Sequence, residues 1–220
     1  MLYFLLLYGS SLSTWQIFAF VVAYFLALCI AMTLHEFSHA FAATKMGDPT
    51  PRLQGRLTLN PFAHMSGIGL ICFLIAGFGW AKPVEVNPLR FKKYRAGMAW
   101  VSVSGVITNL ILAFVFSSLV FFISFDTSNL FMFFLQQFIY YSFAINLALA
   151  VFNILPIYPL DGFNFIKSFC KDGNKFVSFM YRYGSFILLI FIASPLFDFI
   201  YSYVIFGVEF VFFSFWGLFI

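Results

Sequence analysis

Long apolar stretches separated by short charged loops constrain this chain more than any other feature of its sequence. Residues 15–44, 97–125 and 130–155 are each long enough to cross a membrane as a helix, which takes roughly 20 residues. Residues 184–220 are also apolar but are interrupted by Pro195, so they have room for one span or two. With 63% hydrophobic and only 9% charged residues, the composition excludes an ordinary soluble domain. We expect an all-α polytopic membrane protein with a single integral membrane domain over residues 1–220.

The distribution of positive charge predicts how the chain crosses the membrane. The twelve Lys and Arg residues fall in three clusters: Lys45, Arg52 and Arg56; Lys82, Arg90, Lys92, Lys93 and Arg95; and Lys167, Lys171, Lys175 and Arg182. Because cytoplasmic loops carry the excess of Lys and Arg, we expect the N-terminus outside and the chain entering the cytoplasm after Lys45. The opposite side would hold Asp126, Asp198 and Glu209.

Residues 66–80 form a shorter apolar stretch between two of these clusters. Both flanks are expected in the cytoplasm, so this stretch is predicted to be re-entrant. Residues 1–8 are apolar but too short to span, and they are predicted to be interfacial. The chain would then have about five to six transmembrane or re-entrant segments. Residues 56–60 and 84–87 alternate polar and apolar side chains, a pattern typical of half-buried strands. A small membrane-associated β element is therefore expected beside the helices.

One motif near the end of the first long stretch carries chemistry. Residues 35–39 read His-Glu-Phe-Ser-His, an HExxH pattern. On a helix His35 and His39 share a face and can bind one zinc ion, with Glu36 beside the metal-bound water. Two histidines and a glutamate in an apolar segment are costly without a function. The motif predicts a zinc hydrolase site inside the membrane.

A third zinc ligand is needed, and the candidates are His64, Asp48, Glu85, Asp161 and the remaining acidic residues. Asp161 is favoured because Pro156 and Pro159, just before it, should end the preceding helix at the same cytoplasmic depth as the HExxH motif. Asp161 also lowers the charge of a dication with two neutral imidazoles from +2 to +1, and ionised Glu36 balances the rest. His64 is kept as the weaker alternative, since it is equally compatible with a structural role in its loop.

These motifs together resemble the site-2 protease family of intramembrane zinc metalloproteases, in its compact bacterial branch without a PDZ domain. The resemblance rests on HExxH and on Asn-Ile-Leu-Pro-Ile-Tyr-Pro-Leu-Asp-Gly at residues 153–162, and it extends to residues 47–50, 55–64 and 79–84. It covers roughly residues 20–165, leaving 166–220 as a C-terminal loop and membrane segments. The chain departs from the family pattern at residues 65–68 and 103–106, beside the catalytic signatures and not in them.

The resemblance implies one Zn²⁺ per chain, bound by His35, His39 and Asp161, with Glu36 as general base. It implies that Asn153 positions the substrate or the tetrahedral intermediate; an equally weighted alternative is that Asn153 satisfies backbone groups freed by Pro156. It also implies that the β element holds an unwound substrate strand by edge pairing. The reaction implied is cleavage of peptide bonds within or next to transmembrane segments of other membrane proteins.

The partners expected are a transmembrane protein substrate and the lipid bilayer, with the active site towards the cytoplasmic side of a cell membrane. Substrate selection would come from the membrane domain itself or from a regulatory membrane partner, and no nucleic-acid role is indicated.

Two other functions are open. One is a membrane zinc transporter, although the HExxH motif occurs once and no internal repeat is present. The other is a catalytically inactive membrane scaffold, which the intact Glu36 and Asp161 disfavour. A separate stripe of small and polar residues, with Gly105 and Asn109 one turn apart, is predicted to be a helix contact only.

Overall fold

The computed structural model describes residues 12–69, 72, 81–126 and 128–220. Within this part the chain is helical and has no sheet, which confirms the all-α prediction. The elements are α2 (Thr14–Met46), α3 (Thr50–Leu53), α4 (Pro61–His64), η1 (Pro88–Arg90), α6 (Tyr94–Phe122), α7 (Leu130–Asn153), α8 (Asp161–Phe169), α9 (Lys175–Ile192), α10 (Pro195–Trp216) and η2 (Gly217–Phe219).

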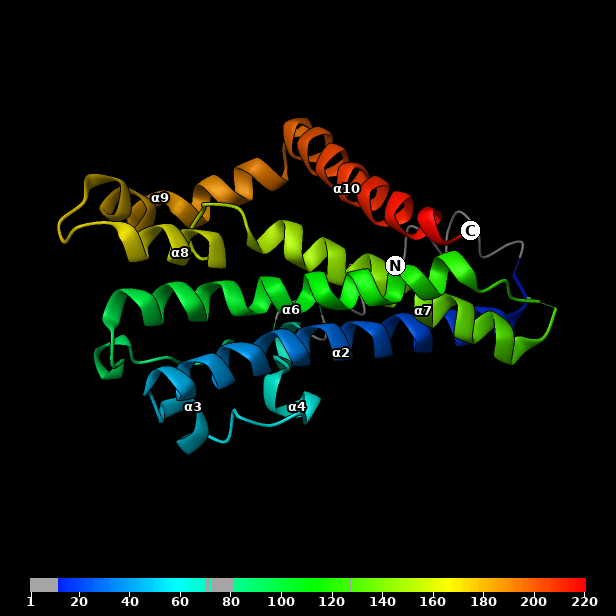
Figure 1. Ribbon diagram of the computed structural model, residues 1–220, viewed down its shortest axis with the longest axis horizontal. Coiled ribbons are helices and arrows are strands. Elements are labelled where there is room, and N and C mark those ends of the chain that lie inside the picture. The colour runs from blue at the N-terminus through cyan, green and yellow to red at the C-terminus, as the bar shows by residue number, and fades with distance from the viewer. Residues whose placement is uncertain (1–11, 70–71, 73–80, 127) are drawn as a thin grey trace.

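Helices α2, α6 and α7 lie side by side along the long axis and form the core (Figure 1). Their bounds agree with the three predicted long spans to within a few residues. On α2 the fully buried Ala23, Ala27 and Ala31 recur every fourth residue, so they share one face. Small side chains let helix backbones approach closely in a membrane, and this alanine face packs against Ile145 of α7.

The long helix α2 has a capping signal at each end. Ser13 and Gln16 form a reciprocal capping box at its start. At its end Gly47 adopts a left-handed backbone conformation, with φ of 110°, and its N–H bonds back to the last turn. The helix therefore continues through the whole HExxH motif, and both histidines project from regular helical backbone.

The C-terminal region forms two helices, α9 and α10; the sequence had allowed either one span or two there. Together with α2, α6 and α7 they make five helices long and apolar enough to span a membrane. They follow one another along the long axis without folding back (Figure 1). Helix α10 begins where Phe197 contacts Phe152 near the end of α7, and finishes where the Trp216 indole donates to Ser117 of α6 at 2.8 Å.

This course of α10 corrects one expectation about charge. Asp198 was predicted on the membrane side opposite the basic clusters. It follows Phe197 directly, so it lies at the depth of the C-terminal end of α7, close to where that helix breaks. The cause is the Ser194 cap with Pro195 at the first helical position, which starts a new helix at that depth.

The predicted β element is not confirmed. Residues 56–60 and 84–87 are outside strands, and the described residues show only an isolated bridge between Met65 and Ala81. In residues 84–87 two backbone donors go to carboxylates and not to a neighbouring strand: Val84 N–H to Glu36 at 3.0 Å and Asn87 N–H to Asp48 at 2.6 Å. Most of the predicted re-entrant stretch 66–80, and the predicted interfacial stretch 1–8, lie outside the described residues.

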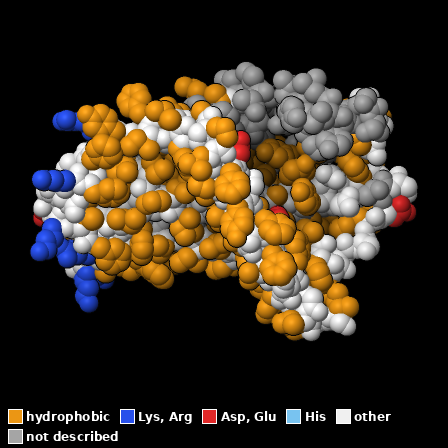
Figure 2. Space-filling view, turned by 90° about the horizontal axis from the view of Figure 1, so that it is seen from above, with side chains coloured by type: hydrophobic (Ala, Val, Ile, Leu, Met, Phe, Trp, Pro, Cys, Tyr) orange, Lys and Arg blue, Asp and Glu red, His pale blue; other side chains and the backbone are white. Residues whose placement is uncertain are grey.

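The surface is that of a multi-pass membrane protein. In Figure 2 the visible Lys and Arg side chains gather at one end of the long axis, and hydrophobic side chains cover much of the described surface next to them. Large apolar side chains are widely exposed along the spans, including Trp100 of α6, Phe186 of α9 and Phe206 of α10. Such a surface is stable in lipid and would aggregate in water.

Candidate metal centre

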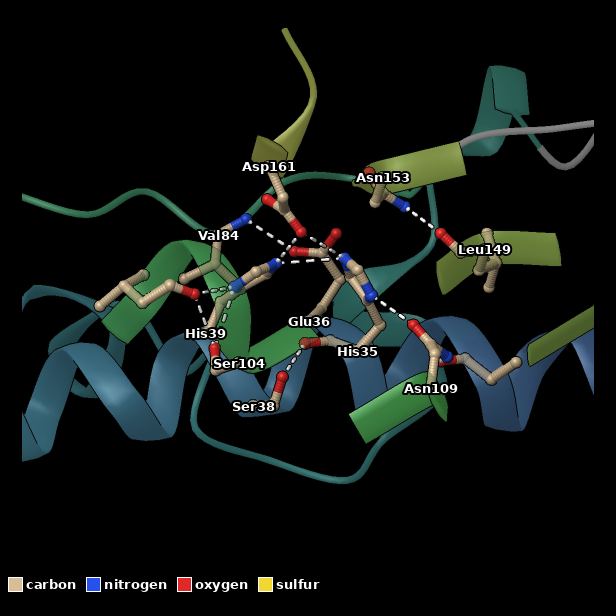
Figure 3. Close-up of polar contacts among 12 residues, drawn as sticks. His35, Glu36, Ser38, His39, Val84, Ser104, Asn109, Leu149, Asn153 and Asp161 are labelled. Atoms are coloured by element: carbon tan, nitrogen blue, oxygen red, sulfur yellow. Dashed lines mark hydrogen bonds and ion pairs between the residues drawn. The ribbon is translucent and has the colours of Figure 1, made fainter. Parts of the chain in front are cut away.

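Three side chains predicted as zinc ligands converge on one point (Figure 3). The Nε2 atoms of His35 and His39 lie 3.1 Å apart. The Oδ2 atom of Asp161 lies 3.3 Å from the first and 3.2 Å from the second. Both histidines are buried, so this cluster is shielded by the helices around it.

The other ring nitrogen of each histidine fixes the tautomer. His35 Nδ1 lies 2.5 Å from the Oδ1 atom of Asn109, and His39 Nδ1 lies 2.8 Å from the backbone carbonyl oxygen of Val101. Both partners are acceptors, because the Asn109 amide nitrogen is turned towards other oxygens. Each Nδ1 therefore carries a hydrogen, and when the rings are neutral each directs the lone pair of Nε2 into the cluster.

This cluster fits a metal ion. Two Nε2 lone pairs and a carboxylate oxygen face one another at short distance, and the buried Asp161 Oδ2 has no hydrogen-bond donor. With both rings neutral, these three atoms repel one another unless a cation lies among them. Two imidazole nitrogens and one carboxylate oxygen are one of the ligand sets of catalytic zinc sites, which keep a fourth position for water.

Gly105 of α6 keeps the space beside the histidines open. A Cβ atom at this position would lie 2.5 Å from Cε1 of His35 and 2.7 Å from the Nε2 atom of each histidine. Any side chain would therefore displace the two rings. The glycine gives α6 its close approach to α2 at the level of the site.

Asp161 reaches the cluster through a break in the chain. Helix α7 ends at Asn153, residues 154–160 turn without forming a helix, and Asp161 is the first residue of α8. A Cβ on the next residue, Gly162, would lie 2.1 Å from the carbonyl oxygen of Ile154. Only glycine lets the start of α8 pack this tightly against the end of α7, and that contact sets the position of the carboxylate.

Glu36 lies next to the cluster and is not part of it. Its Oε2 atom accepts the N–H of Val84 at 3.0 Å. It lines a polar cleft of about 410 Å³ that also contains His35, His39 and Asp161. A carboxylate held beside a metal position, in a polar cleft, is placed for general base chemistry.

Asn153 also lines this cleft, at the last residue of α7. Its side-chain N–H donates to the carbonyl oxygen of Leu149 at 3.0 Å, which is a contact within its own helix. The position in the cleft suits the substrate role, and the contact with Leu149 suits the structural role. Both roles of Asn153 stay predictions.

The other candidate ligands are engaged elsewhere. The Nε2–H of His64 donates to the carbonyl oxygen of Thr58 at 2.8 Å. Asp48 accepts from Thr50 and from the backbone of Asn87, and Glu85 accepts from Gln54. Among the described residues none of the three belongs to the metal-ligand group.

The polar stripe on α6 does more than the predicted helix contact. Asn109 accepts from His35, and its side-chain N–H donates to Asn146 of α7 at 2.7 Å. Asn146 in turn donates to the carbonyl oxygen of Ser142 at 2.7 Å, and both amides are fully buried. The signal was present in the sequence: an amide inside a spanning segment, one turn from a glycine, needs a polar partner.

Known proteins are similar to this chain in sequence. The model of peptidase family M50 matches residues 123–191. The protein named "Putative zinc metalloprotease YwhC" from Bacillus subtilis is 41% identical over 175 residues, which cover 78% of this chain and 80% of the relative. Proteins named "Putative zinc metalloprotease Rip2" are 28% identical over 191 residues in Mycolicibacterium smegmatis (81% of this chain, 68% of the relative) and 32% over 151 residues in Mycobacterium tuberculosis (67% and 56%). No solved structure matches. The chain belongs to peptidase family M50.

Proposed function

We propose that this protein is an intramembrane zinc metalloendopeptidase of the site-2 protease type. It hydrolyses peptide bonds within or next to transmembrane segments of other membrane proteins. The observation that carries the proposal is the convergence of two histidine lone pairs and one carboxylate oxygen beside Glu36, within a bundle of membrane-spanning helices. Membership of a peptidase family supports it.

In this proposal His35, His39 and Asp161 bind one zinc ion, and Glu36 is the general base. When bound, zinc lowers the pKa of a water ligand to about 7 and polarises the scissile carbonyl. The hydrogen bonds from His35 to Asn109 and from His39 to Val101 hold both rings in the tautomer that a metal requires.

Glu36 transfers protons in both halves of the reaction. Its carboxylate takes a proton from the attacking water and passes it to the nitrogen of the leaving amine, so it is regenerated in each cycle. The N–H of Val84 donates to Oε2 of Glu36 and restricts where this carboxylate can point. The same contact ties the loop before η1 to the catalytic side of α2.

The substrate must unwind before it is cut. In a regular transmembrane helix every carbonyl is hydrogen-bonded and shielded. A peptide carbonyl therefore becomes available to the site only after the substrate helix opens locally. The polar cleft accommodates such a segment, because Asn153, Asn164 and Lys167 line it and can pair with freed backbone groups.

The proposed active site faces the cytoplasm, with the N-terminus on the opposite side. The support is the positive charge: the Lys and Arg side chains visible in Figure 2 lie at one end of the molecule. Cytoplasmic loops carry such an excess. Two of the three clusters flank this centre in the sequence, at the end of α2 and from α8 into α9.

A Glu36→Gln variant tests the proposal. The full chain is reconstituted in lipid vesicles with a lysine-flanked leucine-alanine transmembrane peptide that carries Asn-Gly-Pro near one end. The variant keeps every proposed zinc ligand, so it should retain its zinc. Its cleavage rate should fall by about 10²–10⁴-fold, because general base catalysis is lost. Metal content and peptide cleavage are measured on the same samples.

The control is Glu209→Gln, which removes the same charge from α10, outside the cleft residues. This variant should cleave like the wild type. The proposal is wrong if Glu36→Gln cleaves at the wild-type rate. It is also wrong if neither form cleaves and both carry zinc across the vesicle membrane at equal rates, which is the behaviour of a transporter.

A further inference from the structure

Two hollows of opposite character meet at the candidate metal centre. The polar cleft of about 410 Å³ contains Glu36 and the histidines. A larger apolar groove of about 890 Å³ lies between α6 and α8. Ser102 and Asp161 line both hollows, so the groove leads directly to a proposed zinc ligand.

Helix α8 separates the two hollows through its amphipathic sequence. Asp161, Asn164 and Lys167, spaced three apart, line the polar cleft. Gly162, Phe165 and Ile166 line the apolar groove. This three-and-four periodicity gives one polar and one apolar face to the same short helix. The carboxylate of Asp161 stands at the boundary between them.

We infer that the apolar groove between α6 and α8 is the docking site for the transmembrane helix of the substrate. The substrate chain passes from this groove into the polar cleft at Asp161, where it is cut. The inference rests on the proposed protease function and adds to it the surface that receives the substrate.

The position and lining of the groove favour a membrane helix as its occupant. Helix α6 is long and apolar enough to span the membrane, and the groove runs along it from Ala96 to Leu110. The exposed Trp100, Ile107 and Phe165 offer apolar contact area along its walls. Ala96 and Ala99 are small, and small residues allow the backbone of a second helix to come close.

Continuity with the site distinguishes a peptide from a lipid chain as occupant. A lipid tail makes equivalent apolar contacts anywhere on the apolar surface, so it gains nothing from a groove that ends at a carboxylate. A substrate helix that unwinds frees backbone N–H and C=O groups, which are costly in an apolar groove and can be paired in the polar cleft. The boundary at Asp161 therefore localises the unwinding next to the metal position.

Photocrosslinking tests the docking step without using activity. Benzoylphenylalanine is placed at Ile107 of the groove in the full-length Glu36→Gln protein, in vesicles that contain the leucine-alanine peptide with Asn-Gly-Pro. The matched control is Ile30 of α2, which is 37% exposed against 39% for Ile107 and lies outside the groove lining. We expect at least about fivefold more peptide crosslinked at position 107 than at position 30.

Equal crosslinking at the two positions overturns the inference. So does a probe at position 107 that labels phosphatidylglycerol of the vesicles and no peptide, since the groove is then a lipid site. Strong peptide crosslinking at position 107, with no cleavage by the wild type, supports the docking site and contradicts the proposed protease. The two failures are therefore distinguishable.

A substitution that obstructs the groove provides a second readout. Ile107→Trp should lower cleavage of the transmembrane peptide, relative to cleavage of a short water-soluble peptide with the same Asn-Gly-Pro sequence, by about tenfold or more. Ile30→Trp should leave this ratio at the wild-type value. The inference is overturned if Ile107→Trp retains its zinc and keeps the wild-type ratio.

Discussion

The two halves of the candidate metal centre are built in different ways. His35 and His39 project from the regular backbone of α2, one turn apart, and their relative position follows from helix geometry. Asp161 stands at the start of α8, after residues 154–160 leave the helical path. The spacing within the first half is set by local structure. The second depends on how tightly two helix ends pack.

The site therefore has two structural requirements, the helical spacing of the histidines and the packing of α8 against α7. Each half must bring its ligand atoms to the same point. In α2 the spacing of the two histidines comes from the helix itself, while α8 needs the end of α7 as a support. Glycines control both tertiary contacts: Gly105 where α6 meets the histidines, and Gly162 where α8 meets α7. Substitutions at these glycines test how much each half depends on its neighbours.

The largest effect is expected for Gly105→Ala. The new Cβ would lie 2.5–2.7 Å from atoms of both imidazole rings, so the rings must turn away from the metal position. We expect zinc affinity to fall by more than about 100-fold, beyond the 10–100-fold typical of outer-shell changes. Metal content after dialysis against a zinc buffer, and cleavage of the membrane peptide, measure this loss.

The control for this variant is Gly207→Ala in α10, where an added Cβ meets open space. It should keep wild-type zinc affinity. If Gly105→Ala also binds zinc normally, the histidine half tolerates displacement by α6, and the site is less closely packed than its geometry indicates.

Gly162→Ala tests the other half. A Cβ placed 2.1 Å from the carbonyl oxygen of Ile154 forces α8 away from α7, and Asp161 moves with it while both histidines stay in place. Zinc affinity should fall by about 10–100-fold, and overpacking should lower the free energy of unfolding by about 1–3 kcal/mol. Zinc titration and thermal unfolding in detergent measure the two quantities.

The same Gly207→Ala variant serves as the control in α10. A Gly162→Ala protein that unfolds earlier but binds zinc as tightly as the wild type would show that Asp161 is positioned independently of this helix contact. That result would remove the difference between the two halves.

The sequence predicted each half to the extent that local rules determine it. The HExxH spacing, the break at Pro156 and Pro159, and the choice of Asp161 over His64 all follow from helix periodicity, proline geometry and charge. The three core spans were predicted for the same reason, since apolar length alone defines them. These features need no knowledge of which helices touch.

Features that depend on contacts between distant segments were missed or are not confirmed. The alternating residues 84–87 matched a strand, but Glu36 and Asp48 accept the backbone hydrogens that a strand partner would need. The contact of Asn109 with His35 joins residues 74 positions apart. The polar stripe indicated that α6 faces a partner, yet only the packed structure shows that this partner is a proposed zinc ligand.

The smallest of the three effects is expected for Asn109→Leu. Asn109 contacts His35 on the side of the ring that faces away from the metal position. Leucine cannot accept the hydrogen on Nδ1 of His35, so this ring loses its fixed tautomer and orientation. We expect zinc affinity to fall by about tenfold, at the lower end of outer-shell effects. Asn109→Asp keeps an acceptor for the ring and should restore most of the affinity, while Asn146→Ala removes the next amide without touching His35.

If Asn146→Ala weakens zinc binding as much as Asn109→Leu, the two amides act through helix packing. If only Asn109→Leu weakens it, and Asn109→Asp rescues it, the regular helix α2 also needs a tertiary contact to orient its ligand, and the two halves of the centre differ in degree and not in kind.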